Sequence, residues 1–288
     1  MSATDILLPV PTARRRKPAK ARAYSTFRVV MLVLIVLTFV APLVWMVLSS
    51  LKTNVDIYNP EAAFVFTPTT ANYETVFGQA SYLQYIFNSF WVGLCSTVLS
   101  MILGVPAAYS MSRFVMKKSA ALVLMARIIP GVSLLVPWYF VFSNLKLVGG
   151  YQVLILSHMF ILLPLFVYIM MSFFDSLPLE LEEQAQVDGL TPIGAFLRIA
   201  LPLSIPGIAT AAILSFIFSW NNFMFALVLS GSKTKTLPVA IFDFVAYASI
   251  DWGGLMAAAV VITLPIMVIA LFTQKYIVSG LTAGATKG

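Results

Sequence analysis

The sequence predicts an all-α, polytopic membrane protein with six transmembrane helices and a cytoplasmic helix–turn–helix between the fourth and fifth helices. Of its 288 residues, 60% are hydrophobic and 10% are charged, whereas a soluble domain carries about 25% charged residues. The mean hydropathy is +0.94, which excludes a disordered chain. Uncharged stretches with a length near or above that needed to cross a bilayer recur six times. One cysteine, Cys95, excludes an intrachain disulfide and a cysteine-based metal site.

Stretches without Asp, Glu, Lys or Arg mark the candidate helices, because a charged side chain at the bilayer centre costs about 2.5–3.5 kcal/mol on insertion scales. A helix needs about 20 residues to cross the hydrocarbon. The third stretch is short, so we extend that helix to 119–142, which places Arg127 inside it. The six stretches are 29–51, 75–112, 128–145, 147–174, 199–232 and 252–274.

Arg127 has two interpretations. It either extends its guanidinium to the headgroups, or it forms a buried ion pair or a charge on a solute pathway. No other predicted span contains an acidic residue that could pair with it, which favours the first interpretation.

Basic residues predict the orientation. Thirteen of the eighteen Lys and Arg residues lie before the first helix, after the second and fourth helices, and at the C-terminal end, whereas the opposite side has four. The positive-inside rule therefore places both termini in the cytoplasm. We expect 1–28 to be a basic tail that contacts membrane lipid rather than nucleic acid, because such tails bind anionic lipid. The six-helix domain spans 29–277, with a cytoplasmic loop at 175–204 and an external loop at 231–254, and a cytoplasmic tail follows at 278–288.

The loop at 175–204 predicts two helices and a turn. Ser176 is expected to cap the first helix, with Pro178 in its first turn, and Gly189 to end it in the left-handed conformation. Thr191 and Pro192 then start the second helix. Two interpretations stay open: the loop packs on its own bundle, or it docks a soluble partner. The apolar side chains expected to share a face are Leu177, Leu181 and Ala185 on the first helix, and Ile193, Phe196, Leu197 and Ala200 on the second.

The same loop contains a longer motif. It reads Glu183-Gln184-Ala185, three residues, Gly189, nine residues, and Ile199-Ala200-Leu201-Pro202. This resembles the E-A-A-x3-G-x9-I-x-L-P signature of permease subunits of ATP-binding-cassette (ABC) importers, with Gln184 in place of the first Ala. The chain is most similar to the smaller, six-helix subunit of the maltose-type, carbohydrate-uptake branch, and this wider resemblance rests also on Ile129-Pro130-Gly131, on Trp220-Asn221 and on the ending from Gly280 to Gly288.

The resemblance implies a coupling helix that seats in a cleft of a separate ATPase. It implies that Glu183, Gln184, Ala185, Asp188 and Gly189 form the coupling site, with Leu181 and Phe196 as packing support. It also implies a sister permease, two ATP-binding subunits, an extracytoplasmic solute-binding protein and a carbohydrate or polyol substrate, in a bacterial or archaeal cytoplasmic (inner) membrane. The sequence has no G-x-x-x-x-G-K-[ST] motif, so we expect this chain to bind no cofactor and the partner ATPase to bind ATP and Mg.

Polar side chains inside the predicted spans are candidates for a substrate path, because they must face the bundle or a wet cavity. Amides, hydroxyls and aromatic rings suit a sugar, but Asn and Ser in membrane helices also bond neighbouring helices. We expect no metal site and no catalytic residue, and His158 fits a structural role. The alternatives are an ion-coupled secondary transporter of a small neutral solute, for which intramembrane acids are lacking, and an intramembrane enzyme. The path candidates are Ser219, Trp220, Asn221 and Asn222.

Overall fold

The computed structural model describes residues 19–78, 81–245 and 250–282, with side chains described for 24, 26–78, 81–245 and 250–274. Every regular element in these ranges is a helix, and the two isolated bridges, Gly149–Ser230 and Val245–Ile250, build no sheet. The all-α prediction is therefore confirmed for the described residues. The chain divides into two compact units, Met1–Leu48 and Ser49–Gly288, and each is described by itself.

Helix α1 (Ala19–Ser50) makes up the described part of the first unit. Its section Thr26–Ser50 is long and apolar enough to cross a membrane. Apolar side chains surround the helix, as expected of a helix that lipid or other membrane helices enclose. Most of the predicted tail 1–28 lies outside the described residues.

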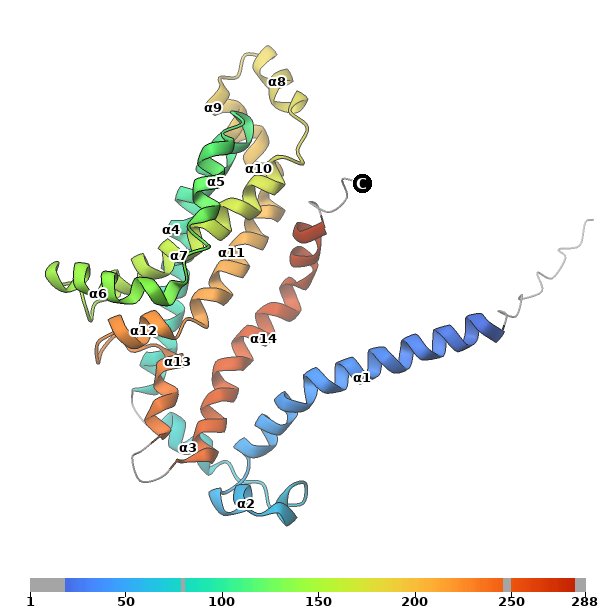
Figure 1. Ribbon diagram of the computed structural model, residues 1–288, viewed down its shortest axis with the longest axis vertical. Helices are drawn as coiled ribbons and strands as arrows, with labels where there is room; N and C mark the ends of the chain where they lie inside the picture. The colour runs from blue at the N-terminus through green and yellow to red at the C-terminus, as the bar shows by residue number, and fades with distance from the viewer. Residues whose placement is uncertain (1–18, 79–80, 246–249, 283–288) are drawn as a thin grey trace, which may run out of the picture. The chain divides into compact units, whose positions relative to one another are not determined.

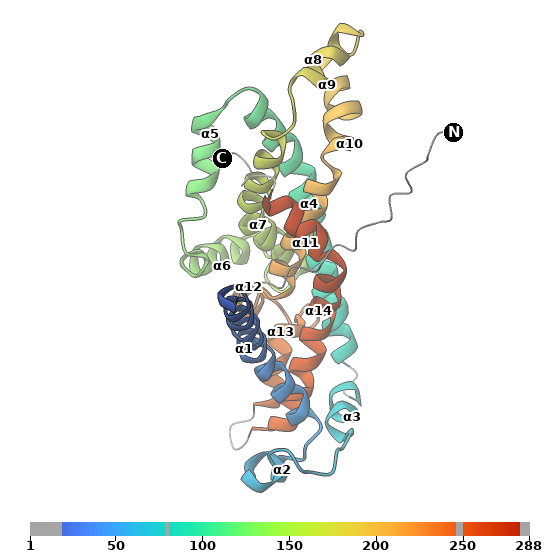
Figure 2. The same ribbon diagram turned by 90° about the vertical axis from the view of Figure 1, so that its right-hand side faces the viewer.

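Four long helices form the centre of the second unit: α4 (Tyr82–Arg113), α7 (Tyr151–Phe174), α11 (Ile205–Trp220) and α14 (Trp252–Thr282). Figures 1 and 2 show α4, α7 and α11 side by side, and α14 packs on α11. Glycines permit the close approach of these helices. A Cβ atom on Gly104 of α4 would lie 2.7 Å from the Phe166 ring of α7, and one on Gly207 of α11 would lie 2.5 Å from the Phe173 ring.

Four helices are continuous candidate spans by length and composition: the sections Thr26–Ser50, Tyr82–Arg113, Tyr151–Phe174 and Trp252–Gln274. They match four of the six predicted stretches. The second predicted stretch starts too early, because a separate helix, α3 (Ala71–Gly78), precedes α4. Helix α14 continues to Thr282, beyond the predicted domain boundary at 277, and 283–288 lie outside the described residues.

The third predicted span is not one helix, so the prediction of a continuous helix over 119–142 was wrong. Helix α5 (Lys117–Met125) ends in turns, and η2 (Gly131–Leu134) and α6 (Leu135–Asn144) follow. Pro130 explains the break: it has no N–H to donate, and its ring disfavours helical backbone at Ile129.

The fifth predicted span, 199–232, is bent and broken. Before α11 the chain passes through α9 (Pro192–Ala195), the π-helix η3 (Phe196–Ala200) and α10 (Leu201–Leu203). The section Pro192–Leu203 meets Ile205–Trp220 at a bend of 69°, and the two form a fifth span if they are counted together. Helix α11 stops at Trp220, and a short helix, α12 (Met224–Leu229), follows.

Short helices cover the two ends of the second unit. Helices α2 (Asn54–Tyr58), η1 (Pro60–Ala62) and α3 belong to the segment between α1 and α4. The predicted external loop 231–254 contains α13 (Leu237–Ala240) and η4 (Ile241–Phe244). Helices α8 (Glu180–Val187) and α9 lie at one end of this unit in both views, and α2 and α3 lie at the other (Figures 1 and 2).

Candidate functional site

The turn between α8 and α9 has the predicted geometry. Gly189 has φ +96°, in the left-handed region that favours glycine. Its N–H donates to the Gln186 carbonyl at 3.0 Å, and the Leu190 N–H donates to the Ala185 carbonyl at 3.0 Å. These two bonds form a Schellman motif, which satisfies the last carbonyls of α8. Because no atom would lie within 4 Å of a Cβ atom added to Gly189, backbone conformation and not space demands the glycine.

The start of the second loop helix is also as predicted. Thr191 is the N-cap of α9, and its hydroxyl oxygen accepts a hydrogen bond from the Gly194 N–H at 3.1 Å. Pro192 occupies the first turn, where a missing N–H costs nothing.

The predicted start of the first loop helix was wrong. Ser176 does not cap α8, because its hydroxyl donates to the Phe173 carbonyl at 2.6 Å and thereby helps to end α7. The N-cap of α8 is Leu179, which makes no side-chain cap. Glutamates in the first turn of α8 still stabilise its positive end.

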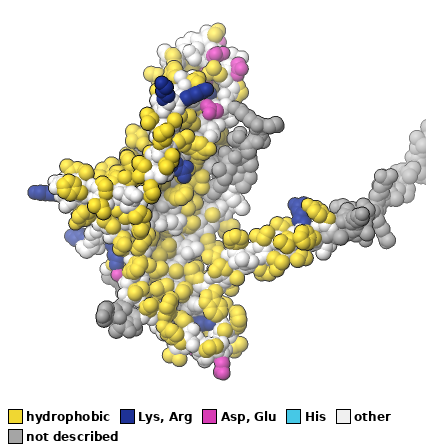
Figure 3. Space-filling view, viewed as in Figure 1, with side chains coloured by type: hydrophobic (Ala, Val, Ile, Leu, Met, Phe, Trp, Pro, Cys, Tyr) yellow, Lys and Arg dark blue, Asp and Glu magenta, His cyan; other side chains and the backbone are white. Residues whose placement is uncertain are grey.

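Most of the predicted coupling residues lie on the outer surface of α8. Glu183, Gln184 and Asp188 are exposed, and Leu181 is 40% exposed. Figure 3 shows acidic side chains at this end of the molecule. Ala185 is buried, so the predicted stripe of Leu177, Leu181 and Ala185 does not form: Leu177 precedes α8 and Leu181 faces outward.

Glu182 is the acidic residue of α8 that points inward, and it is a functional residue that the sequence pattern did not predict. Its carboxylate pairs with the Arg113 guanidinium of α4 at 2.7 Å and accepts a bond from the Tyr109 hydroxyl at 2.5 Å. Arg113 also donates to the carbonyls of Phe174, at 2.9 Å, and Leu177, at 3.4 Å. We call Tyr109, Arg113 and Glu182 the loop anchor. It joins α8 to α4 and to the end of α7.

Two further contacts strengthen this junction. The Ser112 hydroxyl of α4 donates to Asp175, directly after α7, at 2.5 Å. The Phe196 ring of η3 lies 4.4 Å from the Tyr109 ring, centroid to centroid, so Phe196 packs against the loop anchor. A displacement of α8 would therefore pull on the ends of both α4 and α7.

The four candidate path residues are divided by the break after α11. Ser219 is buried and hydrogen-bonded to Ser96 at 3.1 Å and to His158 Nδ1 at 2.7 Å. Trp220 is buried, and its indole N–H donates to the Ile262 carbonyl at 3.2 Å. These two residues connect helices.

The two asparagines lie at the break itself. Asn221 is exposed, and its amide donates to the Ile217 carbonyl at 3.0 Å. The Asn222 side chain accepts a bond from the Phe225 N–H at 3.2 Å, close to the start of α12. Of the four candidates, Asn221 is therefore the one whose side chain is exposed. Among the residues that the structure describes, no cluster of His, Cys, Asp and Glu could hold a metal ion.

Comparisons with known proteins agree in one family. Residues 96–283 match the family described as binding-protein-dependent transport system inner membrane component. The chain is 36% identical over 252 residues to the sulfoquinovosyl glycerol transport system permease protein SmoH of Agrobacterium fabrum, covering 86% of this chain and 88% of SmoH. It is 36% identical over 270 residues to the trehalose transport system permease protein SugB of Mycobacterium tuberculosis, covering 92% and 98%.

A solved structure shares the fold. It is a crystal structure of a bacterial ABC transporter involved in the import of the acidic polysaccharide alginate, with a TM-score of 0.77 at 18% identity. The match covers 91% of this chain and 99% of the other.

Proposed function

Because this chain belongs to the family of binding-protein-dependent transport system inner membrane components, we propose that it forms half of the translocation path for a carbohydrate or polyol. It is the permease subunit of an ABC importer, and a separate subunit binds and hydrolyses ATP. Family membership decides against the ion-coupled alternative. The names of three relatives refer to transport of trehalose, sulfoquinovosyl glycerol and diacetylchitobiose. These differ from one another, so they support carbohydrates as the substrate class of this chain but do not identify one sugar.

The observation that carries the proposed ATPase contact is the exposed surface of α8, a helix that the loop anchor attaches to α4. Glu183, Gln184 and Asp188 face outward, and Gly189 shapes the turn. We assign them to the contact with the ATPase, with Leu181 as an exposed apolar contact. Ala185 and Phe196 support the loop from inside. The loop anchor then transmits a displacement of α8 to the membrane helices.

The proposed topology has six spans and cytoplasmic termini. The broken segment α5–α6 provides the third span, and α10, α11 and α12 together provide the fifth. Two considerations support this: α8 and α2 lie at opposite ends of the second unit, and a six-span arrangement places thirteen of the eighteen basic residues on the side that the positive-inside rule assigns to the cytoplasm.

The proposed assembly contains a sister permease, two ATP-binding subunits and an extracytoplasmic solute-binding protein. The family description names dependence on a binding protein, and a structural relative was crystallised with a pentasaccharide-bound periplasmic protein. Asn221 remains our candidate contact for the solute within this chain, with Asn222, Ser219 and Trp220 shaping the helix break beside it.

The test is ATP hydrolysis by the complex, co-expressed with its genomic neighbours and reconstituted in proteoliposomes. We expect stimulation by a sugar-loaded binding protein, and its loss when Glu183→Gln is combined with Gly189→Val. A β-branched residue at φ +96° adds about 1–2 kcal/mol of strain, which is roughly 5–30-fold in the docked population.

Two matched controls separate docking from folding. Glu180→Gln removes a neighbouring exposed carboxylate, and Gly78→Val adds a side chain whose Cβ atom would have no neighbour within 4 Å among the described residues. Both should keep the stimulation. If the permease folds but co-purifies with no ATPase, or if the double variant is stimulated as fully as the parent chain, the assignment of α8 fails.

A further inference from the structure

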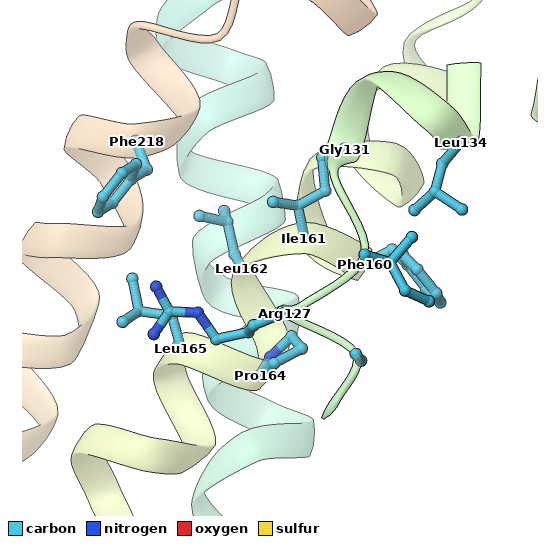
Figure 4. A pocket seen from close by; sticks show the side chains of 11 residues that line it. Arg127, Gly131, Leu134, Phe160, Ile161, Leu162, Pro164, Leu165 and Phe218 are labelled. Atoms are coloured by element: carbon cyan, nitrogen blue, oxygen red, sulfur yellow. The ribbon is translucent and has the colours of Figure 1, made fainter. Parts of the chain in front are cut away.

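A pocket lies where the chain breaks between α5 and α6. It has a volume of about 210 Å³, and Figure 4 shows the Arg127 side chain extending past Pro164 toward Leu165. The lining comes from the break itself, from α7 and from α11: Ala126, Arg127, Ile129, Gly131, Leu134, Phe160, Ile161, Leu162, Pro164, Leu165 and Phe218.

The pocket lies at the middle depth of the helices. Helices α4 and α7 run side by side, because the Tyr151 hydroxyl donates to Asn88 near one end, at 2.7 Å, and Arg113 donates to Phe174 near the other. The lining residues 160–165 are the central part of α7. Arg127 therefore lies beside the middle of α7 and not beside either of its ends, which favours the second interpretation, a charge on a solute pathway.

Irregular backbone at this depth requires water or protein around it. Chain that is not helical is tolerated inside a membrane only where it is buried in protein or lines a water-filled cavity. The turns at 126–130 are exposed for the most part. Pro164 leaves a further polar group without its helical partner, because its ring nitrogen cannot donate to the Phe160 carbonyl. Both Phe160 and Pro164 line the pocket. We infer from the exposed turns and from the Phe160 carbonyl that water enters the pocket.

The charge of the pocket lining is purely positive. Arg127 is the one charged residue among its eleven lining residues, and none of them is acidic. An intramembrane cation faces a partner or a wet path by default, and this pocket provides no partner of its own. A guanidinium presents its donors in a planar fork that matches carboxylate, sulfonate and phosphate groups.

We propose that this pocket is a hydrated station in mid-membrane where Arg127 binds the anionic oxygen group of a solute in transit. The assignment rests on the proposed permease function, which brings the solute to this depth. The volume is below the roughly 300–1,000 Å³ of a pocket for a whole ligand, so it takes one acidic group and not an entire oligosaccharide. An anionic lipid headgroup offers the same chemistry, and the experiment distinguishes it.

The experiment measures cysteine accessibility in the reconstituted complex. In a Cys95→Ser background, Ile161→Cys places a thiol in the pocket while Arg127 is kept. Tyr168→Cys, on the same helix and outside the pocket lining, is the matched control. The reagents are an anionic sulfonatoethyl and a cationic trimethylammonioethyl methanethiosulfonate, and the readout is the ratio of the two reaction rates.

We expect both reagents to modify Ile161→Cys, with the anionic one favoured. Arg127→Gln should lower the rate ratio about tenfold, as expected for the loss of one nearby charge, and should leave the ratio at Tyr168→Cys unchanged. Sodium glucuronate should protect Ile161→Cys when Arg127 is present, whereas glucose at the same concentration and ionic strength should not. The proposal is overturned if the thiol of Ile161→Cys does not react with either reagent, or if Arg127→Gln leaves the ratio of the two reaction rates unchanged.

Two arms separate the remaining outcomes. The measurements are made in phosphatidylcholine and in phosphatidylglycerol liposomes. If protection requires phosphatidylglycerol and not glucuronate, the anion is a lipid and the solute station is refuted. ATPase stimulation is recorded on the same samples. If the binding protein does not stimulate ATP hydrolysis by the parent complex, but the ratio of the two reaction rates at Ile161→Cys still depends on Arg127, the coupling proposal is refuted and the anion pocket is not.

Discussion

At the residue scale, one buried carboxylate holds an exposed loop to the membrane helices. Glu182 is 3% exposed, whereas Glu180, Glu183 and Asp188 on the same short segment face outward. A buried carboxylate is tolerated only when it is paired and hydrogen-bonded, and Arg113 and Tyr109 satisfy it.

Arg113→Met should therefore destabilise the chain more than the loss of a surface charge. Breaking a buried pair by removing one partner costs about 3–5 kcal/mol, because a buried charge is left uncompensated. Lys117→Met, which removes an exposed cation nearby, should change stability by less than about 0.5 kcal/mol. Adding Glu182→Leu to Arg113→Met should restore part of the loss. Thermal unfolding of the purified chain in detergent measures all three, and equal midpoints for the two single variants would contradict the anchor.

How well a residue could be predicted depends on where its partners lie in the sequence. Gly189 and Thr191 have partners within five residues, so the local pattern predicted their conformations correctly. Glu182 depends on Arg113, which is 69 residues away, and no local pattern separates it from its glutamate neighbours. Its one signal was the spacing of three from Ala185, which places both on the same helix face.

At the element scale, small residues determine how closely the membrane helices pack. Gly207 lies on α11 where the Phe173 side chain of α7 crosses it. Without the hydrophobic effect between helices in lipid, this contact is stabilised by van der Waals packing and depends on close approach.

Gly207→Ala should therefore weaken the contact between α11 and α7. A Cβ atom would lie 2.5 Å from the Phe173 ring and 3.1 Å from its Cβ, so the ring and the helix must move, at a cost of about 1–3 kcal/mol. Gly78→Ala is the control, because no atom of the part of the chain that the structure describes would lie within 4 Å of its Cβ atom. Unfolding in detergent is again the measurement, and a Gly207→Ala chain as stable as the control would show that the helices separate freely here.

Charge-free stretches predicted which segments enter the membrane better than they predicted continuous helices. They identified α1, α4, α7 and α14 because these helices are uninterrupted apart from single prolines. They missed the breaks at Pro130 and at Asn221, because Pro, Gly and Asn carry no charge and a count of charges does not detect them. As a result, Asn221 and Asn222, which were predicted to lie inside a continuous span, lie where α11 ends and α12 has not yet begun.

At the scale of the whole molecule, the proposed topology rests on charge together with geometry. The loop with α8 and the segment with α2 lie at opposite ends of the second unit, and thirteen of the eighteen basic residues belong to the side of α8 in the six-span arrangement. An ATPase in the cytoplasm can reach α8 only if that end is cytoplasmic.

Impermeant maleimide labelling tests this orientation in the Cys95→Ser background. Arg198→Cys, at an exposed position of η3, should react only in inside-out vesicles, and Lys233→Cys, at an exposed position before α13, only in right-side-out vesicles. Both sites are exposed, so the reagent's side of the membrane decides the result and local burial does not. Reaction of Arg198→Cys from outside would invert the topology and remove α8 from the reach of any ATPase. Reaction of both sites from the same side would mean that an even number of crossings, or none, separates them. That result would contradict the single crossing assigned to α10, α11 and α12.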